Sequence, residues 1–100
     1  MKFEGIYTPI ITPHTEDGSI DKKAFAEVAE FLIDAGVHCI VVGGSTGEYY
    51  AQTYEERIEM MNLASELINK RVLLMVGTGA TRTEDCVMLA KAAKAAGADF

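Results

Sequence analysis

The fold is decided by residues 39–48, which read CIVVGGSTGE. Cys39–Val42 is a continuous apolar run, which is typical of a strand buried on both faces. The glycines that follow let the backbone come close to a ligand, and the adjacent hydroxyls of Ser45 and Thr46, beside free N–H groups, suit an oxyanion such as a carboxylate. A strand that opens through a loop into a helix is where α/β folds bind their ligands. The stretch therefore predicts a site for a small anionic substrate.

Two further apolar runs, residues 6–12 and 72–76, predict two more strands beside the one at residues 37–42. Residues 98–100 read as the start of a fourth strand. Continuous apolar strands separated by helices form a parallel sheet covered by helices. We therefore expect residues 1–100 to be the N-terminal part of one α/β domain, cut at the start of its fourth strand. That domain is either a (β/α)₈ barrel of about 250 residues or a doubly wound sheet.

Three helices are expected between and after these strands. The first begins after Asp21, a predicted N-cap, and ends at Gly36. Residues 53–56 and 81–84 each have the pattern of a capping box, which predicts the starts of the second and third helices, and Gly97 ends the third. Apolar residues recur at helical spacing in all three, and we expect them to be buried: Phe25, Val28, Ala29, Leu32 and Ile33, then Met60, Leu63, Ala64 and Leu67, then Cys86, Leu89, Ala90 and Ala93.

Composition narrows the class of protein. The 100 residues are 49% hydrophobic and 24% charged, as in a globular domain, and the net charge of −6 argues against nucleic acid or an anionic membrane surface as a partner. No apolar run is long enough for a signal peptide or a membrane span. Cys39 and Cys86 have no metal-ligand spacing, so we expect both to be buried thiols of a reduced, cytoplasmic protein.

Other motifs are weaker. Residues 43–48 lack the Lys-Ser or Lys-Thr of a phosphate-binding P-loop, and residues 77–82 match only two glycines of a dinucleotide-binding fingerprint. No histidine pair or cluster indicates a metal site. We expect His14 to be a solvated loop residue and His38 to lie at the opposite end of the sheet from the ligand loop. Tyr49 and Tyr50 follow that loop, and either of them could line the pocket while the other packs.

The lysines are informative because none suits covalent catalysis. An amine nucleophile needs a desolvated place at the carboxyl end of a strand in order to be neutral near pH 7. The chain has six lysines, and each lies in a helix, at the N-terminus or before the third strand: Lys2, Lys22, Lys23, Lys70, Lys91 and Lys94.

Four stretches together resemble one family, the pyruvate-dependent class I aldolases typified by dihydrodipicolinate synthase and N-acetylneuraminate lyase. They are residues 5–13, 17–21 and 43–48, and residues 77–80 leading to 96–99, so the resemblance covers almost all of the chain. It implies a (β/α)₈ TIM barrel, commonly assembled as a homotetramer or dimer. It also implies a lysine that joins pyruvate or another 2-keto acid as a Schiff base, with no metal or organic cofactor.

The resemblance also implies roles for single residues. Thr46 would hold the keto-acid carboxylate through its hydroxyl and backbone N–H, with Ser45 beside it. The Ser45 hydroxyl would also join a proton relay to a tyrosine, and Tyr49 is a candidate for lining the pocket. The family's Schiff-base lysine and relay tyrosine would lie beyond residue 100, so we expect the 100-residue segment alone not to catalyse.

The chain departs from the family pattern in three places. His14 stands where many members have Phe, and residues 49–52 are bulkier than in many synthases. Ser45 in place of Thr favours the neuraminate lyase and sugar-acid aldolase branches. Three functions remain open: a Schiff-base lyase or aldolase (or a sugar-acid dehydratase of the same family), a lysine-less keto-acid-binding or regulatory homologue, and an α/β enzyme that uses the loop for phosphate.

Overall fold

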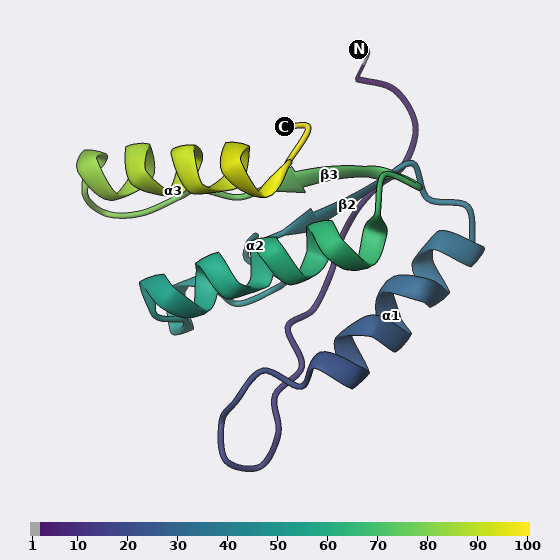
Figure 1. Ribbon diagram of the computed structural model, residues 1–100, viewed down its shortest axis with the longest axis horizontal. Helices are drawn as coiled ribbons and strands as arrows, with labels where there is room; N and C mark the ends of the chain where they lie inside the picture. The colour runs from purple at the N-terminus through teal and green to yellow at the C-terminus, as the bar shows by residue number, and fades with distance from the viewer. Residues whose placement is uncertain (1–2) are drawn as a thin grey trace.

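The computed structural model describes residues 3–100, in which three strands alternate with three α-helices (Figure 1). A single 3-10 turn, η1, follows the second strand. In chain order the elements are β1 (Tyr7–Pro9), α1 (Lys22–Asp34), β2 (Cys39–Val42), η1 (Tyr49–Ala51), α2 (Tyr54–Ile68), β3 (Leu73–Val76) and α3 (Thr83–Ala96). The strands are parallel and lie in the order β1-β2-β3. The three predicted βα units are therefore confirmed.

The strands are shorter than the apolar runs that predicted them. The prediction of a first strand over residues 6–12 is wrong at its end, because β1 stops at Pro9. The Ile10 N–H still donates to the Val41 carbonyl at 3.0 Å, but Ile11 is exposed and the Thr12 side chain leaves the sheet for another loop. Proline cannot donate to a strand ladder, so Pro9 and Pro13 bracket the place where the chain turns away from the sheet.

Local hydrogen bonds explain where the first two helices begin and end. Asp21 caps α1 by accepting from the Ala24 N–H at 3.0 Å. Thr53 caps α2, since its hydroxyl accepts from the Glu56 N–H at 3.1 Å while the Glu56 carboxylate accepts from the Thr53 N–H at 2.9 Å. Donation from the Thr53 backbone N–H to the Glu56 carboxylate lowers the pKa of Glu56, and the Thr53 hydroxyl acts in the same direction. The glycine predicted to end α1, Gly36, has φ +92°, a left-handed conformation that glycine adopts without strain.

The capping box predicted for the third helix is wrong. The N-cap of α3 is Arg82, and no side chain bonds to the helix N-terminus there. Glu84 instead pairs with the Arg82 guanidinium at 2.5 Å. The helix starts one residue later than the pattern indicated, which puts Thr81 outside it. Its other end is as predicted, with Gly97 at φ +97°.

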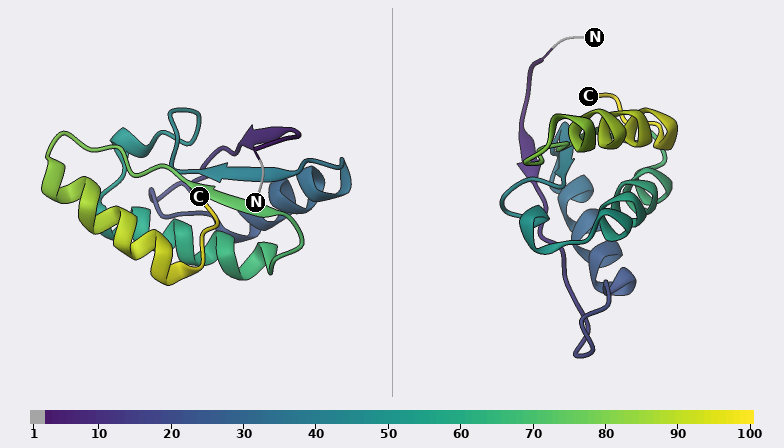
Figure 2. Two further views of the ribbon diagram at one scale, coloured as in Figure 1. Left: turned by 90° about the horizontal axis from the view of Figure 1, so that it is seen from above. Right: turned by 90° about the vertical axis from the view of Figure 1, so that its left-hand side faces the viewer.

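All three helices cover one face of the sheet (Figure 2). Alternate strand residues face them and join one buried cluster with the helices: Ile10, Ile40, Val42, Leu74 and Val76 from the sheet side, and Phe25, Ala29, Met60, Met61, Ala64, Ile68, Leu89 and Ala93 from the helices. Most of the predicted helix stripes are confirmed by this cluster and by the half-buried side chains packed on it. Ala90 is the exception, because it is exposed on α3.

The opposite face carries two rows of strand residues in register. Tyr7, Cys39 and Leu73 form one row, and Pro9, Val41 and Met75 form the next. In parallel strands that alternate between two faces, such rows are what a barrel interior is built from.

Residues 98–100 run beside β3. The Asp99 and Phe100 N–H groups both donate to the Leu74 carbonyl, at 2.8 and 3.2 Å, and the Val76 N–H donates to the Phe100 carbonyl at 3.0 Å. The Asp99 carboxylate accepts from the Leu74 N–H at 2.9 Å and pairs with Lys70 at 3.7 Å. No strand is assigned to residues 98–100, and that they begin a fourth strand stays a prediction.

Replacing Thr53 by Ala in the full-length protein should lower the free energy of unfolding by about 1 kcal/mol, because the capping hydroxyl is lost. Replacing Thr81 by Ala should change it by less than about 0.5 kcal/mol, since Thr81 is exposed and caps nothing. Urea denaturation of both variants measures the difference. Equal losses would contradict the assignment of Arg82 as the N-cap of α3.

Candidate active site

The candidate site lies at the carboxyl edge of the sheet, where the loops after β2 and β3 touch. The Gly77 N–H donates to the Val42 carbonyl at 2.7 Å. Gly43 has φ +75°, and a Cβ on Gly77 would overlap the Gly43 carbonyl group. Only glycine at position 77 permits this approach of two backbones. The β2–α2 loop, which carries Ser45 and Thr46, is therefore placed directly by the end of β3.

The loop itself is a compact turn. The Glu48 N–H donates to the Ser45 carbonyl at 3.0 Å, and Glu48 has φ +58°. Ser45 and Thr46 are both exposed, and within residues 3–100 their backbone N–H groups donate to no protein acceptor. Two adjacent hydroxyls and two free N–H groups are thus available to one ligand. Such a set of donors suits an anion, since successive backbone N–H groups in a turn form an anion-binding concavity.

Thr12 holds this turn from the side of β1. Its hydroxyl donates to the Gly47 carbonyl at 2.8 Å, and the Gln52 side-chain amide donates to the same oxygen at 3.2 Å. Thr12 is 8% exposed, so its hydroxyl is satisfied inside the protein rather than by solvent. The Gly47 carbonyl is therefore fixed by two donors from different segments.

Arg57 holds the neighbouring loop from α2. Its guanidinium donates to the Gly79 carbonyl at 2.6 Å and to the Gly77 carbonyl at 3.0 Å. The guanidinium carbon lies 4.8 Å from the centroid of the Tyr49 ring. Arg57 is 9% exposed, and this burial lowers its pKa. Thr12 and Arg57 are the two buried polar side chains of residues 3–100, and both hold loops at this edge.

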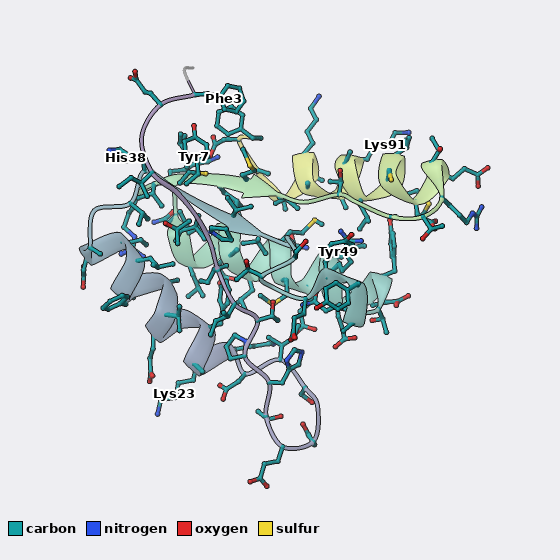
Figure 3. The ribbon with its side chains drawn as sticks, turned by 180° about the vertical axis from the view of Figure 1, so that it is seen from behind. Phe3, Tyr7, Lys23, His38, Tyr49 and Lys91 are labelled. Carbon is teal, nitrogen blue, oxygen red and sulfur yellow. The ribbon has the colours of Figure 1, made fainter. Side chains whose placement is uncertain are left out.

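Tyr49 lines a cavity, but not one that Ser45 or Thr46 shares. The Tyr49 ring lies over the Arg57 guanidinium and next to Gly79. These three residues and Thr81 all line the same cavity. Tyr50 packs edge-on against Tyr49 with ring centroids 5.7 Å apart and remains 69% exposed. Figure 3 shows Tyr49 at this edge of the sheet, with His38 and Tyr7 at the other.

A family model for the dihydrodipicolinate synthetase family matches residues 2–100. The chain belongs to this family. It is 39% identical, over 99 residues, to the 4-hydroxy-tetrahydrodipicolinate synthase of Maridesulfovibrio salexigens; the match covers 99% of the chain and 34% of that protein. The predicted family membership is therefore confirmed.

Solved structures give the same result. A prophage protein of the dihydrodipicolinic acid synthase family from E. coli K12, in complex with pyruvate, is 37% identical with a TM-score of 0.95, over 97% of this chain and 33% of that one. N-acetylneuraminate lyase from Mycoplasma synoviae is 36% identical with a TM-score of 0.88, over 97% of this chain and 34% of that one. The chain thus spans about a third of the length of these relatives.

Within this family fold, the two histidines are not at the Ser45–Thr46 turn. His14 is exposed, as predicted, and pairs through its backbone with Ile20. His38 lies at the opposite end of the sheet, also as predicted, where its Nδ1 accepts from the Ile6 N–H at 2.9 Å. A side chain on Gly5 would collide with this imidazole. His38 is therefore a structural residue.

The cysteines and lysines supply no nucleophile at the site. Cys39 is buried as predicted, while Cys86 is only half-buried, and both thiols are free. The five lysines between residues 3 and 100 are all exposed, and Figure 3 shows Lys23 and Lys91 projecting from their helices. Lys2 lies outside the described residues. Across that described part, no cluster of three or more His, Cys, Asp or Glu side chains could hold a metal, and no helix is long and apolar enough to cross a membrane.

Sequence reasoning missed Thr12 and Arg57. Thr12 looked like the last residue of a strand, and its partner Gly47 lies 35 positions away. For Arg57 a signal existed, because residues 57, 60, 61, 64 and 68 are all buried and share one face of α2. An arginine in an otherwise apolar helix stripe indicates a buried partner, which here is a pair of backbone carbonyls.

Replacing Gly77 by Ala in the full-length protein should lower the free energy of unfolding by about 2 kcal/mol or more, because the new methyl group overlaps the Gly43 backbone. Gly44 to Ala is the matched control, since a Cβ there meets nothing within 4 Å. It should change stability by less than about 1 kcal/mol. Urea denaturation measures both, and a Gly77 variant as stable as the Gly44 variant would contradict the close approach of the two loops.

Proposed function

We propose that this chain forms the first three βα units of a (β/α)₈ barrel that acts as a Schiff-base-forming lyase or aldolase on pyruvate or a related 2-keto acid. The observation that carries the proposal is the exposed Ser45–Thr46 turn, whose free donors lie at the carboxyl edge of a parallel sheet. Barrel enzymes place their active sites at that edge. Support also comes from the related E. coli K12 protein, which was solved in complex with pyruvate.

The turn would act on the carboxylate of the keto acid. Thr46 would bind it through its hydroxyl and backbone N–H, and Ser45 would lie beside it. Hydrogen bonds to a charged group contribute about 1.5–3 kcal/mol each, so two or three of them suffice to orient a small acid. Because these donors are neutral, an anion can bind here although the chain carries a net charge of −6.

The covalent step would require an amine from outside residues 3–100, since the five lysines in that range are exposed. The amine nitrogen would add to the keto carbon and the carbonyl oxygen would leave as water, which gives an iminium. The carbon next to the iminium carbon keeps the electron pair when its bond to the following carbon breaks, and the iminium accepts this pair to give an enamine. In the reverse direction the enamine supplies the pair that forms this carbon–carbon bond. The Ser45 hydroxyl would pass protons between substrate and a tyrosine in this cycle.

The relatives favour this reaction type without choosing its branch. A synthase, a pyruvate-bound protein and a lyase match at 39, 37 and 36% identity. They support an aldolase-type enzyme rather than a lysine-less binding protein, a sugar-acid dehydratase or a phosphate enzyme. A cytoplasmic homo-oligomer, tetrameric or dimeric, is part of the proposal and rests on the family resemblance alone.

The full-length protein, treated with pyruvate and then borohydride, should gain a single reduced pyruvyl adduct by intact mass spectrometry. The reason is that borohydride converts the iminium to a stable secondary amine. The matched control is the same treatment with lactate, which has no carbonyl to form an imine. Absence of the adduct in a folded full-length protein would contradict the proposed chemistry.

In the full-length protein, replacing Thr46 by Val should raise the pyruvate concentration needed for half-maximal trapping by about tenfold or more. The substitution removes one hydrogen bond to a charged carboxylate, and 1.4 kcal/mol corresponds to a factor of ten. Replacing Thr83 by Val is the matched control, because Thr83 is also exposed but lies at the start of α3. Indistinguishable trapping curves for the two variants would rule out Thr46 as the carboxylate ligand.

A further inference from the structure

The buried guanidinium of Arg57 binds backbone carbonyls instead of a carboxylate. Within residues 3–100 no Asp or Glu pairs with it, and its hydrogen bonds go to the carbonyls of Gly77 and Gly79. Arg71 differs from Arg57, because it is exposed and donates hydrogen bonds to both carboxylate oxygens of Glu30, at 3.0 and 2.6 Å. Burying a guanidinium is unfavourable unless its donors are well used. The position of Arg57 therefore needs an explanation beyond packing.

The two carbonyls belong to the segment that leaves β3, and Gly77 is the residue on which the Ser45–Thr46 turn rests. The Gly77 N–H is bound to Val42 in β2, and its carbonyl is bound to Arg57 in α2. Gly77 is thus held at both of its backbone groups, by the two elements that flank the turn. Rotation of this residue would move the surface against which Gly43 packs.

Arg57 also contacts the turn from its other end. The Tyr49 ring lies on the guanidinium, and the Tyr49 N–H donates to the Gly44 carbonyl at 3.4 Å. Contacts of Arg57 therefore reach the chain on both sides of Ser45 and Thr46. Before the turn they act through Gly77, which packs on Gly43, and after it they act through Tyr49. A cation over an aromatic ring is attracted to it, and more strongly when the pair is removed from solvent.

We propose that Arg57 is a positioning residue for the keto-acid site, which fixes the Ser45–Thr46 turn by binding Gly77 and stacking on Tyr49. The inference rests on the proposed function. Arg57 itself touches no substrate. It acts by holding the donors of the turn in the geometry that one carboxylate needs, so that no ordering remains to be done on binding.

The test is the pyruvate dependence of borohydride trapping in the full-length protein, compared among wild type, Arg57→Met, Arg57→Lys and Arg71→Met. Arg57→Met keeps much of the volume but releases both carbonyls. It should raise the pyruvate concentration for half-maximal trapping about tenfold. This is less than the roughly hundredfold loss of rate that a misplacement of about 1 Å can cause. The limiting trapping rate should change less than about twofold, because the amine and keto carbon are untouched. A merely structural role would lower stability and leave this concentration unchanged in the folded protein.

Arg71→Met is the matched control, since it removes an arginine with two hydrogen bonds to a side chain away from the carboxyl edge. It should leave the half-maximal concentration unchanged. Arg57→Lys retains the charge but has one nitrogen for two carbonyls, so it should give an intermediate value, and it decides the matter if Arg57→Met does not fold. A half-maximal concentration within twofold of wild type in the folded Arg57 variant would overturn the inference. No adduct in wild type would instead overturn the proposed function and this inference with it.

Discussion

The contact between Gly77 and the β2–α2 loop is the constraint on which the site depends. A hydrogen bond of 2.7 Å joins the Gly77 N–H to the last residue of β2, and the Gly43 carbonyl lies where any side chain at position 77 would be. The loop can approach so closely because both residues lack a Cβ. With one side of the turn fixed by backbone, the exposed donors of Ser45 and Thr46 take one arrangement instead of many, which is what binding a small anion requires.

Two buried polar side chains complete this arrangement. Thr12 binds the Gly47 carbonyl from the β1 side, and Arg57 binds the Gly77 and Gly79 carbonyls from the α2 side. Backbone carbonyls in loops have no strand or helix partner, and leaving them unpaired inside the protein costs about 1–3 kcal/mol each. The same side chains that satisfy these groups also connect three successive βα units at the edge where the ligand is expected. Stability and site geometry therefore depend on the same few hydrogen bonds.

Much of this could be predicted because it is local in sequence. The turn at residues 43–48 follows a strand directly, Asp21 and Thr53 cap the helices three residues ahead of their partners, and apolar spacing identifies the buried helix faces. The features that were not predicted either join residues far apart in the sequence or depend on which of two local interactions forms. Thr12 and Arg57 find partners 20 to 35 positions away. Residues 81–84 have the sequence pattern of a capping box, but Glu84 forms an ion pair with Arg82 instead. No propensity rule predicts which of these two interactions forms.

We propose that the Ser45–Thr46 turn, preset by Gly77, binds the carboxylate of a 2-keto acid. The most direct test is a crystal structure of the full-length protein after reduction with pyruvate and borohydride, which fixes the ligand covalently in place. The pyruvyl carboxylate should lie within hydrogen-bond distance of the Thr46 hydroxyl and backbone N–H, with Ser45 beside it. A carboxylate bound elsewhere, with this turn empty of ligand, would contradict it.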